Sequence, residues 1–196
     1  MFPCLMELQL EAALSAWSRL EEKPRLQIMM PGVCDVEELR ILRACATGVA
    51  GSLGSELPEL GSMLELPRAC ILAEELAAEA DFLSFGTGDL TESTCGVSRY
   101  DSHLSFLPEY LKRQVFQADP FQAIDQKGVG ALMTWALERV KAKYPSVEMG
   151  ICGAQVVEPE SLKFCAELGL DYISVPVHHL PMAQLIAAKV ALRQRS

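Results

Sequence analysis

Short, almost continuously hydrophobic runs alternate along the chain with longer stretches in which apolar residues recur every three or four positions. The short runs have the length of buried strands and lie at residues 26–31, 62–67, 81–86, 147–153 and 171–177. The longer stretches predict helices at 5–21, 35–50, 67–80, 128–143 and 159–169 and from 181 onward. An excursion at 90–127 interrupts the alternation, and one helix is predicted in it, at 107–117. Buried strands separated by helices indicate an α/β fold with a parallel sheet.

Two architectures fit this order of elements. One is an open, doubly wound sheet of five strands, and the other is a partial TIM-type (β/α)8 barrel. A complete barrel usually needs about 250 residues and eight strands, whereas this chain has 196 residues and five predicted strands. We expect a single domain over residues 1–196, and in either architecture ligands bind at the carboxyl ends of the strands.

Composition narrows the possible partners. The net charge of −9 argues against nucleic acid and against an anionic membrane surface, because both require basic patches. An anionic small molecule stays possible where a metal ion neutralises it locally. No apolar run approaches the ~20 residues that span a bilayer. Seven cysteines without CxxC spacing favour a reducing compartment, and we expect a cytoplasmic location.

An acidic residue follows the third predicted strand directly. The segment Gly86-Thr87-Gly88-Asp89 is too rich in glycine to be core, and it places a carboxylate at the mouth of a hydrophobic strand. Asp89 has two interpretations: it caps a helix that starts at Leu90, or the strand delivers it to a ligand.

Other reactive side chains follow the neighbouring strands. Glu65 lies near the end of the second strand, Cys152 follows the fourth, and Tyr172 and Ser174 lie on the fifth. Two carboxylates at adjacent strand ends are a suitable ligand set for Mg²⁺, which takes one or two protein carboxylates. A neighbouring cysteine can act as a proton donor or a nucleophile. The alternative interpretations are a surface ion pair for Glu65 and a small buried hydrophobic residue for Cys152.

Longer motifs identify a family. The segment "GSMLELPRACILAEELAAEADFLSFGTGDLTESTCGVSRYD" at residues 61–101 resembles the phosphoenolpyruvate-binding barrel of the pyruvate, phosphate dikinases. The similarity continues through "DPFQAIDQKGVGALMTWALERV" at residues 119–140, "GICG" at 150–153 and "GLDYIS" at 169–174. Phosphoenolpyruvate synthases and enzyme I of the sugar phosphotransferase system share some of these elements, whereas the excursion points to the dikinase branch. The resemblance implies that the chain forms about the last five β/α units of a barrel.

The resemblance also implies a reaction and a site. In this family the barrel binds phosphoenolpyruvate or pyruvate with Mg²⁺, and a phosphohistidine on a separate domain exchanges the phosphoryl group. By position, Glu65 and Asp89 match the metal ligands, and Cys152 matches the acid that protonates the enolate. The residues on the substrate side are matched by Ser84, Thr87, Gly88 and Tyr172.

The chain departs from the family at three places. Gly88 replaces an asparagine whose amide would bind the substrate, the loop 154–157 lacks the family's charged and titratable residues, and His179 replaces an arginine. The strands that carry the family's substrate-clamping arginines are also not recognisable in the sequence, nor are the phosphohistidine and nucleotide-binding domains.

These departures leave three hypotheses. The chain is a truncated or split dikinase that is inactive alone, a non-catalytic paralogue that binds a ligand or regulates a full-length dikinase, or a gene-model fragment. We expect a homodimer or association with the missing dikinase parts. The plastid stroma is an alternative location if a longer precursor exists.

Overall fold

The computed structural model describes residues 3–194 and contains one parallel sheet. Its strands are β1 (Gln27–Met30), β2 (Glu59–Leu64), β3 (Phe82–Gly86), β4 (Glu148–Cys152) and β5 (Tyr172–Ser174). Their order in the sheet, β1-β2-β3-β4-β5, is their order in the sequence. A doubly wound sheet reverses its strand order at a switch point, whereas a (β/α) barrel places each strand beside the previous one. The sheet is therefore an arc of a TIM-type barrel, and the doubly wound alternative is wrong.

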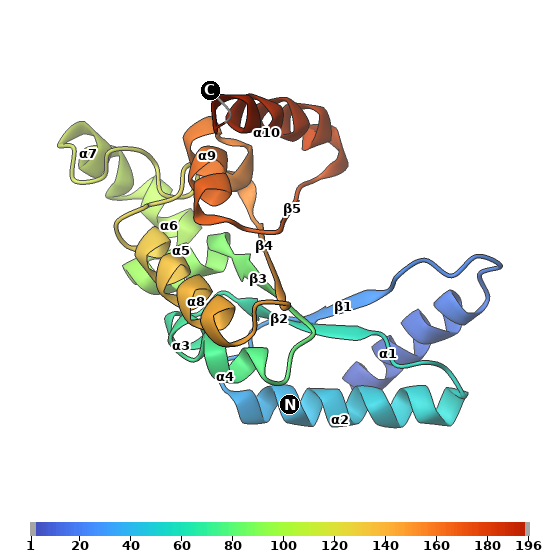
Figure 1. The fold of residues 1–196 in the computed structure, drawn as a ribbon. Coiled ribbons are helices and arrows are strands. Elements are labelled where there is room, and N and C mark those ends of the chain that lie inside the picture. The colour runs from blue at the N-terminus through green and yellow to red at the C-terminus, as the bar shows by residue number, and fades with distance from the viewer. Residues whose placement is uncertain (1–2, 195–196) are drawn as a thin grey trace.

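Helices cover one side of this arc. They are α1 (Pro3–Ser18), α2 (Val36–Leu53), α3 (Pro67–Ile71), α4 (Ala73–Ala77), α5 (Thr87–Cys95), α6 (Arg99–Leu104), α7 (Leu107–Lys112), α8 (Val129–Lys143), α9 (Pro159–Leu168) and α10 (Leu180–Gln194), with short 3-10 turns η1 (Ala154–Val157) and η2 (Val177–His179). Figure 1 shows α3, α4, α5, α8 and α9 along the same side of the strands, with α10 beyond β5. None of the helices within residues 3–194 is both long and apolar enough to cross a bilayer.

The two faces of the sheet differ in chemistry because side chains alternate along each strand. The outer face carries the main core, in which Leu60, Leu83, Phe85, Met149 and Ile151 are fully buried against the helices. The inner face carries the other set, which runs from charged residues at the amino ends of the strands to acid, thiol and hydroxyl groups at the carboxyl ends.

An ion-pair network shows how strongly the sheet curls. Arg25 precedes β1, and its Nη2 lies 2.6 Å from Glu59 Oε2 on β2 and 3.0 Å from Glu148 Oε2 on β4. In a flat sheet β1 and β4 would be roughly 14 Å apart, given the usual spacing of neighbouring strands. Only a curled sheet brings both partners within reach of one guanidinium, which is the geometry of a barrel wall.

Several elements differ from the sequence-based expectation. The second strand starts three residues earlier than predicted, at Glu59, and ends at Leu64. The helix predicted at 67–80 is divided into α3 and α4 at Leu72, whose φ of −94° and ψ of 16° depart from helical values. The excursion contains α5 and α6 in addition to α7, the helix that the pattern predicted. The predicted helix at 159–169 is confirmed, with Gly169 in the left-handed conformation after its last turn.

Candidate functional site

Strand register places the candidate residues in one row at the carboxyl edge of the sheet. Gly86 pairs with Cys152, and Cys152 pairs with Ser174. Leu64 pairs with Phe85, so Glu65 is level with Gly86 on the same inner face. Ser84 and Tyr172 occupy the inner-face positions one layer below, on β3 and β5. Because side chains alternate between the two faces of each strand, residues from four strands that are far apart in the sequence lie together on the inner face.

Glu65 is a buried carboxylate that directly follows the last residue of β2. Its side chain is 7% exposed, and its Oε1 accepts a hydrogen bond from the Gly32 backbone N–H at 2.5 Å. Its other oxygen lies over Gly86, where a Cβ would come 2.7 Å from Oε2. The absence of a side chain at Gly86 therefore makes room for the carboxylate. Burial raises the pKa of Glu65, the Gly32 N–H opposes this, and the neighbouring Asp89 raises the pKa further.

Asp89 lies in the first turn of α5, next to Glu65. The helix begins at Thr87 directly after β3, so Asp89 is not the cap of a helix that starts at Leu90, and that interpretation is wrong. Its side chain is exposed, and a carboxylate in a first turn is favoured by the helix dipole. The Ser93 hydroxyl lies 2.8 Å from the Asp89 carbonyl and 3.2 Å from the Glu65 carbonyl, which ties α5 to the end of β2. Two carboxylates held this close repel each other unless a proton or a cation lies between them.

Cys152 lies beside this carboxylate pair. Burial raises the pKa of its thiol, the hydroxyl of Ser84 opposes that effect, and the charges of Glu65 and Asp89 add to it. The side chain is therefore a neutral thiol at neutral pH, which favours a proton donor over a nucleophilic thiolate. Ser84 is fully buried, and its Oγ lies near enough to lower the pKa of the thiol but makes no hydrogen bond of ordinary geometry in the part of the chain that the structure describes.

Tyr172 lies on the inner face of β5, one layer below the row of candidate residues. Its hydroxyl donates a 3.0 Å hydrogen bond to the Leu83 carbonyl, and its ring lies where a Cβ on Gly150 would be. Phe82 covers Gly61 in the same way, so two glycines on the inner face each make room for an aromatic ring from the next strand. Burial raises the pKa of the Tyr172 hydroxyl, so it stays protonated, and its proton is the one donated to the Leu83 carbonyl.

The predicted substrate residue Thr87 makes internal contacts. Its hydroxyl lies 3.0 Å from the Cys152 carbonyl and 2.9 Å from Gln155 Oε1, and the residue is fully buried. Gln155 is 1% exposed, and its Nε2 donates to the Pro120 carbonyl at 3.1 Å. Gln155 was noted in the sequence only as a departure from the family. Its amide fixes the loop after Cys152, and the sequence signal for this role was a lone polar residue between apolar neighbours.

A cavity of about 680 Å³ opens beside the thiol. It is lined by residues that include Gln122, Cys152, Ser174, Pro176 and His179. The rings of His178 and His179 lie 4.2 Å apart. Across residues 3–194, no group of three or more His, Cys, Asp or Glu side chains is placed to hold a metal ion. The pair Glu65 and Asp89 offers two carboxylates, and any metal ion bound there would need further oxygens from a ligand or water.

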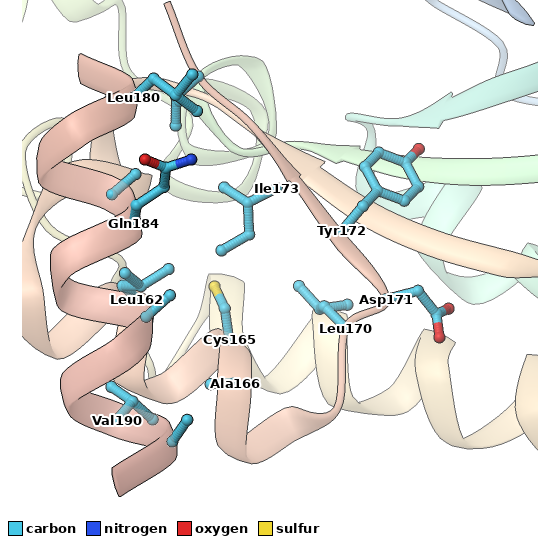
Figure 2. A pocket seen from close by; sticks show the side chains of 14 residues that line it. Leu162, Cys165, Ala166, Leu170, Asp171, Tyr172, Ile173, Leu180, Gln184 and Val190 are labelled. Atoms are coloured by element: carbon cyan, nitrogen blue, oxygen red, sulfur yellow. The ribbon is translucent and has the colours of Figure 1, made fainter.

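A second cavity of about 360 Å³ lies between α9, β5 and α10. Figure 2 shows its aliphatic lining, which includes Leu162, Ile173, Leu180 and Val190, and shows the Asp171 carboxylate pointing away from that lining. The amide of Gln184 is the polar group that Figure 2 shows among these aliphatic side chains, and the cavity gathers no cluster of acid, thiol and hydroxyl groups like the one at the strand ends, so we place the functional site at the carboxyl edge of the sheet.

A family model for the PEP-utilising enzyme, PEP-binding domain, matches residues 3–192. The chain belongs to this family. Among PEP-utilising enzymes, the pyruvate, phosphate dikinase of Giardia intestinalis is 38% identical over 203 residues, which cover 100% of this chain and 23% of that protein. The chloroplastic pyruvate, phosphate dikinase of Mesembryanthemum crystallinum is 43% identical and is covered to 21%, with 96% of this chain aligned.

The family predicted from the sequence motifs is thereby confirmed. The chain spans about a fifth of the length of these two PEP-utilising relatives. The crystal structure of a citrate lyase from Burkholderia xenovorans LB400 matches the fold with a TM-score of 0.62 at 16% identity, over 95% of this chain and 53% of that one. That likeness concerns the fold alone, and it supports the barrel architecture.

Proposed function

We propose that the chain is the phosphoenolpyruvate- and pyruvate-binding part of a phosphotransferase of the pyruvate, phosphate dikinase type. The observation that carries the proposal is the carboxylate pair Glu65 and Asp89 beside the protonated thiol of Cys152, at the carboxyl edge of a barrel arc. Relatives at 38% and 43% identity that are named pyruvate, phosphate dikinase support the substrate class.

The donor set fits Mg²⁺. Both ligands are carboxylates. The pKa of Glu65 is raised chiefly by burial and further by the charge of Asp89, and a divalent cation would offset the repulsion between the two carboxylates. When bound, Mg²⁺ would supply positive charge to the carboxylate, enolate and phosphoryl oxygens of the ligand. Glu65 is held by the Gly32 N–H and Asp89 by α5, so the chain holds both ligands in place without the metal.

Cys152 supplies the proton in this scheme. The neutral thiol donates its proton from Sγ to the methylene carbon of the enolate, which gives pyruvate, and the thiolate then takes a proton from solvent. The Tyr172 and Ser84 hydroxyls lie one layer below and lend polar contacts on the substrate side. The phosphoryl group moves to or from a histidine of another domain, as the family resemblance implies.

Calorimetric titration with oxalate, a stable mimic of the enolate, tests the proposal. We expect Mg²⁺-dependent binding with a dissociation constant of roughly 1 mM, equivalent to about 4 kcal/mol, and no pyruvate formation from phosphoenolpyruvate by the 196-residue polypeptide alone. Asp89→Ala should abolish the binding, whereas Asp101→Ala, on α6, should leave it unchanged. Oxalate binding that is independent of both Mg²⁺ and Asp89 would overturn the proposal.

A second candidate function is a non-catalytic binding or regulatory partner of a full-length dikinase. It is favoured by the loop after Cys152, where Gln155 is fully engaged by Thr87 and Pro120 and so is unavailable to a substrate. Addition of the missing domains in trans distinguishes the two functions. Pyruvate formation that is lost in Cys152→Ser supports catalysis, and ligand binding without turnover supports the partner role.

A further inference from the structure

His103 connects α6 to a turn much later in the excursion. It lies in the last turn of α6, and its Nε2 is 2.8 Å from Asp119 Oδ2, sixteen residues further along the chain. Its Nδ1 lies 2.6 Å from the carbonyl oxygen of Arg99, one turn earlier in the same helix. The ring also packs against the buried ring of Phe121, with 5.6 Å between the centroids. The contact between His103 and Asp119, here called the His103–Asp119 bridge, therefore fixes α6 relative to the turn that begins at Asp119.

Both ring nitrogens of His103 face oxygen atoms that only accept hydrogen bonds. A carbonyl oxygen has no proton to donate, and an ionised carboxylate has none either. A neutral imidazole carries one N–H and can satisfy one of the two contacts, whereas the imidazolium carries two and satisfies both. The geometry therefore selects the protonated ring.

The charges around the ring agree with this protonation state. The pKa of His103 is raised above 6.5, first by the hydrogen bond to the Arg99 carbonyl and then by the one to Asp119, while burial opposes the rise. Within the described chain, the charges that act on the ring are the Asp119 carboxylate, which favours the imidazolium, and the Arg99 guanidinium, which disfavours it. A group with a raised pKa contributes stability that is fully present below pH 6.5 and is lost as pH rises through the folded-state pKa.

Asp119 organises the turn of residues 119–123. Its Oδ1 accepts a hydrogen bond from the Phe121 N–H at 2.9 Å. Its carbonyl accepts from the N–H groups of Gln122 and Ala123, both at 2.9 Å. Because Oδ2 is bonded to His103, one carboxylate serves both the turn and the bridge. Its side chain is 18% exposed, so water and salt screen the contact less than at an open surface.

The turn 119–123 forms part of the wall of the candidate site. Gln122 lines the cavity beside Cys152. The Pro120 carbonyl accepts a hydrogen bond from Gln155 Nε2 at 3.1 Å, and Gln155 Oε1 lies 2.9 Å from the Thr87 hydroxyl. Since α6 has six residues and is too short to be stable by itself, the position of the wall depends on tertiary links such as the bridge.

We propose that His103 is a positioning residue whose protonated ring holds the turn 119–123 in the wall of the site. Loss of the ring proton removes one of the two N–H donors and the charge that attracts Asp119, so the turn loosens beside Cys152. The bridge stands on the geometry of the excursion, whereas its consequence for a bound ligand rests on the proposed function.

NMR of the three imidazole side chains tests the protonation state. Both nitrogens of His103 should carry protons at pH 6, and the ring should titrate above 6.5. Asp119→Asn should lower that midpoint, because the amide keeps an oxygen for the Phe121 N–H and removes the charge. His178, which is exposed in η2, should titrate equally in both chains. A His103 midpoint at or below 6.5 would overturn the proposal.

Hydrogen exchange tests the positioning. Protection factors, which correct for the intrinsic effect of pH on exchange, should fall roughly 3- to 10-fold at the Phe121 and Gln122 amides as the His103 ring loses its proton. His103→Lys carries a cation that does not titrate between about pH 6 and 9, so its protection should stay constant over that range. His103→Gln should show the reduced protection at every pH, and His178→Gln should behave like the parent chain. Constant protection in the parent chain, or a fall in His103→Lys that matches the parent, would overturn the role of His103.

Titration with oxalate and Mg²⁺ separates this role from the proposed function. We expect the affinity of the parent chain to fall over the pH range in which protection falls, and His103→Lys to lack that step. The comparison with His103→Lys is needed because Glu65 and Cys152 also titrate. A step in protection without a step in affinity confirms the bridge and overturns its consequence for the ligand. If the parent chain binds no oxalate at any pH, the proposed function fails, and NMR and hydrogen exchange still decide the role of His103.

Discussion

Glu65 combines burial with a neighbouring like charge, and this combination makes its protonation sensitive to pH. Its pKa is raised above the ordinary value of 4.5, chiefly by burial. A carboxyl that binds its proton more tightly in the folded state loses that stabilisation as pH rises through its folded pKa. Without divalent cations, the chain should therefore lose stability through this group as pH rises from 4.5 toward neutrality.

Glu65→Gln tests this dependence, because the amide keeps an oxygen for the Gly32 N–H and removes the charge. At pH 7 without metal we expect a higher unfolding midpoint than in the parent chain, with the difference shrinking toward pH 4.5. Added Mg²⁺ should raise the midpoint of the parent chain only. Glu138→Gln, an exposed glutamate on α8, serves as the control. A parent-like pH profile for Glu65→Gln would show that the carboxylate pair is not coupled.

Cys152 should be the cysteine whose reactivity responds to ligand. Burial raises the pKa of Cys70 and of Cys165 to about 12, so these thiols are inert. The charged groups that shift the pKa of Cys34, Cys45 and Cys95 include neither Glu65 nor Asp89, both of which raise the pKa of Cys152. Alkylation at pH 8.5, followed by mass spectrometry, should show Cys152 protected by Mg²⁺ with oxalate and the other described thiols unchanged. Equal labelling of several cysteines with and without ligand would contradict its role.

The residue scale also shows what sequence can and cannot provide. Glu65, Asp89 and Cys152 could be predicted because each follows a hydrophobic run and because strand ends meet at one edge. The role of Gln155 could not, because it depends on a contact across 35 residues to the carbonyl of Pro120. Hydrophobic periodicity, with a period of two residues in strands and 3.6 in helices, does not show which residues far apart in the sequence come into contact.

Among the elements, those with clear boundaries in the sequence were predicted best. Pro159 and Gly169 delimit α9, and Asp35 caps α2 in a capping box with Glu38. For α5 the sequence offered only an alternative, a helix from Leu90, and the start at Thr87 was not foreseen because the segment, with Gly88 and several threonines and serines, has low helix propensity. Its position after β3 and its link to β2 through Ser93 stabilise it instead, which is a tertiary effect.

The start of α9 links that helix to the excursion. Glu158 accepts hydrogen bonds from the N–H groups of Glu160 and Ser161 at 3.0 and 2.7 Å. The Ser161 hydroxyl donates to Glu158 at 2.6 Å and accepts from the Ile124 N–H at 2.9 Å. One glutamate thus caps the helix and orients the serine that holds residue 124.

Glu158→Ala should lower the free energy of unfolding by roughly 0.5–2 kcal/mol, the usual cost of losing an N-cap. Glu158→Gln keeps one acceptor oxygen and should lose less. Urea denaturation followed by circular dichroism measures both. Faster hydrogen exchange at the Ile124 amide in Glu158→Ala would show that the serine has lost its orientation, and equal stability of all three chains would contradict the capping role.

At the scale of the whole molecule, the curl of the sheet brings the candidate site residues together, and it also leaves two sheet edges and an inner face that the described chain does not cover. The Arg25 network closes the amino end of the arc, where Glu59 and Glu148 meet. The carboxyl end of the arc lies at the opposite edge of the sheet from this network and carries the candidate site residues Glu65 and Cys152. Sequence predicted the strands and their helices, but the strand order that excludes a doubly wound sheet came from the structure, since pairing partners are not encoded in local hydrophobicity.

The same curl predicts self-association. Five strands do not close a barrel, and β1 and β5 are both edge strands of the described sheet. Met29 on β1 and Tyr172 on β5 are only half-buried on the inner face, which in a closed barrel is filled by side chains. Pairing of these edges or inner faces between two copies would bury both, so we expect a homodimer at micromolar concentration.

Sedimentation velocity of two variants identifies the surface involved. Met29→Lys places a charge on the inner face beside the β1 edge and should shift the chain toward monomer, because burying an unpaired ammonium is costly. Leu185→Glu alters an α10 side chain that is 52% exposed and should leave the dimer intact. Dissociation by Leu185→Glu alone would move the interface to α10. A parent chain that sediments as a stable monomer at micromolar concentration would show instead that the open inner face is tolerated in water, and that its polar row of acid, thiol and hydroxyl groups suffices to keep the arc soluble.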